Sequence, residues 1–67
     1  MTSAERLEAN AALYRAELSC RVGKDVLRGQ AAPAPGFTAH EWVMYHLLSA
    51  VEDLARGLAE MDKSTKT

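Results

Sequence analysis

The hydrophobic positions of this chain follow helical spacing in two long segments. In the C-terminal segment apolar residues recur every three or four positions, as in a coiled-coil seam, at Met44, Leu47, Val51, Leu54, Leu58 and Met61. The N-terminal segment carries two such stripes on nearly opposite sides. The first consists of Leu7, Ala11, Tyr14, Leu18 and Val22, and the second of Ala9, Leu13, Ala16, Cys20, Gly23 and Leu27. The pattern therefore predicts two long amphipathic helices.

Local signals mark where these helices begin and end. A Thr three residues before a Glu forms a capping box, and this pattern occurs twice, at Thr2 with Glu5 and at Thr38 with Glu41. Gly29 fits the C-terminal cap of the first helix, and the prolines that follow prevent the helix from continuing. We therefore predict a helix over residues 3–28, a stiff Pro/Gly linker over 29–37, a helix over 38–62 and a polar tail over 63–67.

Two long helices joined by a short linker predict an all-α fold, an antiparallel two-helix hairpin. A chain of 67 residues has a marginal core, and its single cysteine, Cys20, excludes an intrachain disulfide. The apolar stripes are also wider than one partner helix covers. We therefore expect a homodimer that forms a four-helix bundle, with core and dimer contacts from Leu7, Tyr14, Leu18, Leu47, Val51, Leu54 and Leu58. The alternative is a loose monomer with exposed apolar surface.

The overall charge narrows the classes of function. Eight Lys and Arg residues balance nine Asp and Glu residues, and the net charge of −1 argues against a dedicated binder of nucleic acid or membrane surfaces. No apolar run approaches the ~18 residues of a membrane span, and the N-terminal residues do not resemble a signal peptide. These features predict a cytoplasmic protein without a membrane partner.

We find no arrangement of side chains that predicts catalysis, a cofactor or a metal site. His40 and His46 are six residues apart, whereas the helical metalloprotease motif needs two histidines four apart. We expect His40 in the first turn of its helix and His46 on the surface, partly exposed. Cys20 lies on an apolar stripe, so we expect a buried and unreactive thiol. By elimination, the sequence predicts a binding module and not an enzyme.

One surface stands out as a candidate binding site. Aromatic residues gather at the linker end of the predicted hairpin, on the side of the second helix away from its heptad seam, and an arginine lies at the same end. Aromatic and Arg side chains are typical of interface hot spots, and we predict partner binding by Arg28, Phe37, Trp42, Tyr45 and His46. The alternative is that Phe37 and Trp42 only staple the helix, while Tyr45 packs on the other chain.

Three stretches of the chain resemble a known family. They are residues 4–10 (AERLEAN), 32–40 (APAPGFTAH) and 49–58 (SAVEDLARGL), which together cover somewhat under half of the sequence. They are similar to the quorum-sensing anti-activator proteins encoded by temperate phages of Pseudomonas. The resemblance implies a compact helical dimer in the bacterial host cytoplasm that binds the DNA-binding region of a LuxR-type transcription activator and blocks its action. It also implies binding to the ATPase that drives type IV pilus assembly, and it carries over no binding residue.

Two other functions are compatible with the same pattern. A helical-hairpin dimer of the ROP type binds nucleic acid, which here would use Arg21, Lys24 and Arg28. The acidic net charge and the presence of Glu17 on the same ridge argue against this function. The third interpretation is a structural or assembly component without an inhibitory role.

Overall fold

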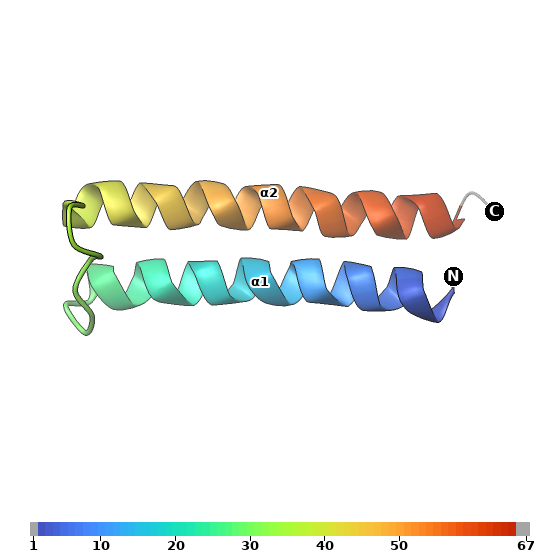
Figure 1. Cartoon of the computed structure of the whole chain (residues 1–67), viewed down its shortest axis with the longest axis horizontal. Helices are drawn as coiled ribbons and strands as arrows, with labels where there is room; N and C mark the ends of the chain where they lie inside the picture. Colours follow the sequence, from blue (N-terminus) through green and yellow to red (C-terminus); the bar gives the residue numbers. More distant parts are fainter. Residues whose placement is uncertain (1, 66–67) are drawn as a thin grey trace.

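The computed structural model describes residues 2–65 and contains two helices, α1 (Ser3–Leu27) and α2 (Ala39–Thr65). They lie side by side in antiparallel orientation, with both chain ends at one end of the molecule and the linker at the other (Figure 1). The hairpin is 45 Å long and only 17 × 15 Å across. No strand occurs among the described residues, so the predicted all-α hairpin is confirmed.

The start of α2 is held by a complete capping box. The Thr38 amide donates a hydrogen bond to Glu41 Oε1 over 3.0 Å, and the Glu41 amide donates one to Thr38 Oγ1 over 3.1 Å. The rings of Phe37 and Trp42, whose centroids are 5.1 Å apart, form the hydrophobic staple that accompanies such a box. At the start of α1, Thr2 accepts the corresponding hydrogen bond from Glu5. Both predicted helix starts are confirmed.

The end of α1 is closed by a Schellman motif. The Gln30 amide donates to the Asp25 carbonyl over 2.8 Å, and the Gly29 amide donates to the Val26 carbonyl over 3.1 Å. This geometry requires the positive φ of +74° that Gly29 adopts. The predicted cap is therefore confirmed.

The linker then reverses direction in a turn centred on Pro35 and Gly36. The Phe37 amide donates to the Ala34 carbonyl over 3.1 Å, and Gly36 has a φ of +89°. A proline followed by a glycine with positive φ is typical of a type II turn. The turn delivers Phe37 directly to the start of α2.

The end of α2 differs from the prediction. The helix continues to Thr65 and does not stop near residue 62, so a polar tail is wrong for residues 63–65. No glycine or proline interrupts this region, and Lys63 Nζ lies 3.5 Å from Glu60 Oε1, one turn earlier. The rest of the predicted tail, residues 66 and 67, lies outside the described residues.

The two helices meet through small side chains. The buried apolar residues of the hairpin are Ala9, Ala12, Ala16, Val26 and Ala50. Gly57 is also buried, and a Cβ atom there would lie 3.0 Å from Leu13 Cδ2 and 3.4 Å from the Ala9 carbonyl oxygen. The backbones therefore approach closely, and this close approach leaves no room for large side chains between them.

An ion pair joins the helices near their centre. Arg15 Nε on α1 lies 3.6 Å from Asp53 Oδ1 on α2, and Arg56 Nη1 lies 3.7 Å from the same oxygen. Because the Asp53 side chain is largely shielded from solvent, this pair favours one register of α1 against α2. Within residues 2–65, neither helix has the length and apolar character that a bilayer-spanning segment requires.

The residues predicted as core and dimer contacts do not form the core of the hairpin. All seven are exposed on the single chain: Leu7, Tyr14, Leu18, Leu47, Val51, Leu54 and Leu58. Successive helical residues are rotated by about 100°, so Tyr14 lies roughly half a turn from the buried Ala12 and Ala16. A core role within the chain is therefore wrong, because the small-residue stripe faces α2. Their role in a dimer stays a prediction.

Cys20 is also exposed, so the expectation of a buried thiol is wrong for the single chain. Its position follows from the same packing. Cys20 lies at the edge of the small-residue contact, where neither helix covers its side chain.

Removing the cap of α2 is expected to destabilise the hairpin. Thr38→Ala loses the hydrogen bond that satisfies the Glu41 amide, which corresponds to about 0.5–2 kcal/mol. Phe37→Ala is expected to lower stability through the lost ring contact with Trp42. Chemical unfolding at one fixed protein concentration measures both effects, with Ser3→Ala at an exposed position as the control. Unchanged unfolding midpoints in both variants would mean that α2 does not depend on this start.

The same capping box makes stability depend on pH. The hydrogen bond from the Thr38 amide and, after it, the bond with the Thr38 hydroxyl lower the pKa of the Glu41 carboxyl below its ordinary value, and His40 acts in the same direction. A lowered pKa in the folded state contributes stability that is present above the unfolded pKa of about 4.3 and is lost as the pH falls through the folded pKa. In Glu41→Gln we expect this contribution to be missing at neutral pH. Urea unfolding of both proteins between about pH 7 and about pH 3 should therefore show midpoints that converge toward acid pH. A constant difference would contradict the assignment.

Candidate functional site

Four aromatic rings gather at the linker end of the hairpin, as the sequence predicts. Trp42 is central: its ring stacks on Tyr45 with centroids 5.9 Å apart, and it meets His46 edge-on at 4.4 Å. Phe37 contacts Trp42 from the linker side and lies 6.3 Å from the Tyr45 ring. The cluster therefore joins the end of the linker to the first two turns of α2.

Half of this cluster belongs to the packing of the hairpin. Trp42 and His46 are only partly accessible, and both ring nitrogens of His46 are buried without a hydrogen-bond partner among the described residues. The Arg15–Asp53 pair sets the register, which places His46 opposite residues near Val22 of α1. The prediction that His46 is partly exposed is confirmed, although both of its ring nitrogens are covered.

The accessible half of the cluster consists of Phe37 and Tyr45. Their side chains are 43% and 55% exposed, respectively, which is high for aromatic residues in contact with other rings. The stacked Trp42 holds Tyr45 in place, so little side-chain entropy remains to be lost when a partner binds. An exposed but immobilised tyrosine is the type of side chain that anchors protein interfaces.

Arg28 lies at the same end but is not part of the cluster. It is the C-terminal cap residue of α1, and its backbone amide donates to the Lys24 carbonyl. Its side chain is exposed and makes no ion pair or ring contact within residues 2–65. The structure thus places the fifth predicted binding residue near the rings without joining it to them.

Sequence reasoning missed the neighbours of Tyr45 along the solvent side of α2. Glu41, Tyr45, Leu48 and Glu52 follow i, i+4, i+7, i+11 spacing and are all exposed; we call them the Tyr45 stripe. Leu48 is 58% exposed, and the Glu41 carboxyl, like any solvent-exposed glutamate, is ionised at neutral pH. The stripe is an apolar strip flanked by negative charges. The helical spacing of this stripe is present in the sequence. It was missed because the adjacent heptad seam contains more of the large apolar residues of α2 and therefore gives the stronger pattern.

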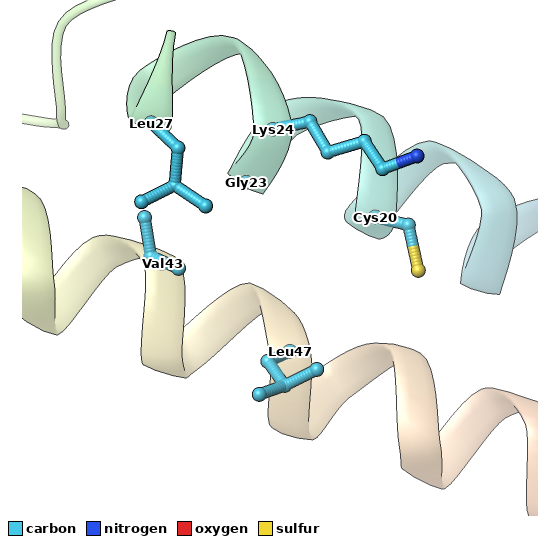
Figure 2. Close-up of a pocket in the computed structure, with 6 residues that line it drawn as sticks. All are labelled: Cys20, Gly23, Lys24, Leu27, Val43 and Leu47. Carbon is cyan, nitrogen blue, oxygen red and sulfur yellow. The ribbon is translucent and has the colours of Figure 1, made fainter.

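A groove lies between the helices on a different side of the hairpin. It encloses about 220 Å³ and is lined by Cys20, Gly23, Lys24, Leu27, Val43 and Leu47. Figure 2 shows Leu27 of α1 directed toward Val43 of α2, with the Cys20 thiol pointing toward α2 and the Lys24 side chain along the rim. Its lining residues include no carboxylate and no imidazole, so they offer no acid–base pair.

Among the described residues no group of three or more His, Cys, Asp or Glu side chains is placed to hold a metal ion.

The cluster is expected to separate into a structural part and an exposed part when its rings are removed. Trp42→Ala deletes a half-buried ring that touches three others, and we expect a loss of roughly 2–3 kcal/mol in unfolding free energy. Tyr45→Ala removes an exposed ring, and we expect a loss of about 1 kcal/mol or less. Chemical unfolding monitored by circular dichroism measures both. Equal losses would show that Tyr45 is as structural as Trp42.

Comparisons of the chain with protein-family models, curated proteins and solved structures find no match. A proposal for the function therefore rests on the fold and on the arrangement of the exposed side chains.

Proposed function

We propose that this protein is a non-enzymatic protein-binding inhibitor whose linker end captures the DNA-binding region of a LuxR-type transcription activator. The observation that carries the proposal is the exposed Tyr45, which is held by Trp42 and flanked by the carboxylates of the Tyr45 stripe. Phe37 and Arg28 extend the same end of the hairpin.

The charge of the Tyr45 stripe supports a basic partner. DNA-binding regions present Lys and Arg side chains that contact phosphates, so their recognition surfaces are basic. Glu41 and Glu52 flank Tyr45 and Leu48 on the exposed side of α2. An apolar strip with acidic flanks complements such a surface and would compete with DNA for it.

The resemblance of three sequence stretches to phage anti-activators supplies the identity of the partner. It also adds the ATPase of type IV pilus assembly as a second partner. The capture of a macromolecule agrees with the shape of the molecule, because two packed helices form an elongated body with long exposed sides. Protein binding is also favoured over RNA binding, since Arg21, one of the three basic residues proposed for that role, is paired with Glu17 at 3.1 Å.

Binding is expected to depend on Tyr45 and Arg28. A hot-spot residue contributes about 2 kcal/mol or more, so Tyr45→Ala and Arg28→Ala should each weaken binding about thirtyfold. The measurement is calorimetric titration with the purified DNA-binding region of a LuxR-type activator, after circular dichroism has shown that each variant is folded. Tyr14→Ala and Arg21→Ala are matched controls, since they remove the same side chains from the outer side of α1.

Three outcomes distinguish the proposal from its rivals. Loss of binding in the Tyr45 and Arg28 variants, with both controls unchanged and with displacement of operator DNA by the wild-type protein, supports it. Unchanged binding in both variants shows that the linker end is not the site. Binding of duplex RNA or DNA by this protein alone, with a steep loss of affinity on added salt, would favour the nucleic-acid function instead.

A further inference from the structure

We infer that a second copy of this chain covers one continuous apolar face of the hairpin, formed by Met44, Leu47, Val51, Leu54 and Leu58 of α2 together with the groove between the helices. We call it the α2 apolar face. It is separate from the Tyr45 stripe, so the inference holds whether or not the linker end captures an activator.

The α2 apolar face is exposed in the single chain along most of the helix. Leu47, Val51, Leu54 and Leu58 are each about half exposed, at 45–56%. Their heptad spacing places them in one row, and the groove continues this row onto α1 through Leu27 and Cys20. A contiguous apolar surface of this length is unusual on a soluble monomer and marks an interaction site.

The surface area of the chain points to a second copy as the occupant. The hairpin exposes 4934 Å², whereas a compact monomer of 7.3 kDa exposes about 4,200 Å². The surplus of roughly 700 Å² is close to the ~800 Å² that each partner buries in a standard interface. The surplus arises from the elongated 45 × 17 × 15 Å shape, and a second hairpin laid against one long face removes it.

The interior of the hairpin leads to the same conclusion. Among the described residues no large side chain is fully buried, and four of the five buried apolar residues are alanines. Alanine side chains bury little area, so the hydrophobic stabilisation available within one chain is small. The leucines that normally supply a helical core lie outside the single hairpin. A two-fold pair of hairpins places them inside a four-helix core.

The groove has the form of a socket for a side chain of the second copy. Gly23 lines it, and a Cβ atom added there meets no atom within 4 Å, so the space above the glycine is open. Leu27, Val43 and Leu47 supply apolar walls. A leucine or methionine from the facing helix would fill such a socket as a knob fills a hole in a coiled coil.

A charge placed on the α2 apolar face is expected to separate the two copies. We expect the wild-type protein to sediment with twice the 7.3 kDa chain mass at micromolar concentration. Leu54→Glu should raise the dissociation constant of the dimer about a hundredfold or more, because a carboxylate would be buried without a partner. We exclude Leu7 from this interface, although the sequence pattern placed it among the dimer contacts, because Leu7 lies 70% exposed on the outer side of α1, away from the α2 apolar face. Leu7→Glu is therefore the matched control.

The outcomes of this experiment decide both the dimer and its face. A wild-type dimer that Leu54→Glu dissociates and Leu7→Glu leaves intact supports the inference. A wild-type protein that stays monomeric at high micromolar concentration, with an ordinary cooperative melting transition, overturns it. A dimer that Leu7→Glu dissociates and Leu54→Glu does not would place the interface on the outer side of α1 and would equally overturn it.

A second measurement keeps the test valid if Leu54→Glu fails to fold. Cys20 is exposed in the single hairpin and lines the groove, so its thiol should become covered when the copies associate. We expect the rate of alkylation by iodoacetamide in the wild-type protein to fall about tenfold or more as the concentration rises through the monomer–dimer transition seen in sedimentation. An alkylation rate that stays constant while the mass doubles would show that the groove lies outside the interface.

Discussion

The close contact of α1 with α2 through alanine and glycine determines most other features of this protein. Ala9, Ala12 and Ala16 let the backbone of α1 approach Gly57 and Ala50 of α2, and the Arg15–Asp53 pair sits in the same contact. Once small residues occupy this contact, the larger apolar side chains of both helices must point elsewhere. The exposed α2 apolar face and the exposed outer stripe of α1 are direct consequences of this packing.

The linker end shows how local structure positions a surface. The Schellman motif at Gly29 ends α1, the turn at Pro35 and Gly36 redirects the chain, and the capping box at Thr38 starts α2. These elements bring Phe37 against Trp42, and Trp42 in turn supports Tyr45. The aromatic residues therefore have two roles, since the partly buried rings stabilise the start of α2 while the exposed rings are available for binding.

The two proposed interfaces use different sides of α2 and are compatible with each other. The α2 apolar face is formed mainly by leucine, valine and methionine side chains, which suits a permanent contact between identical chains. The Tyr45 stripe combines an aromatic anchor with carboxylates, which suits a reversible contact with a basic partner. A two-fold dimer would present two copies of the Tyr45 stripe, so a dimeric activator could be engaged at two points, with a gain in avidity.

The sequence alone determined the secondary structure, because capping boxes, a C-terminal glycine and helical spacing act within a few residues of one another. The exception is the end of α2, which the sequence pattern placed too early because no local signal stops the helix before Thr65. The sequence also placed the aromatic residues at one end of a hairpin. It did not determine which stripe of α1 faces α2, because hydrophobicity favoured the leucine stripe, whereas close backbone approach favours alanine and glycine. That choice belongs to tertiary packing, and it alone decided that Cys20 and the seven predicted core residues are exposed on the single chain.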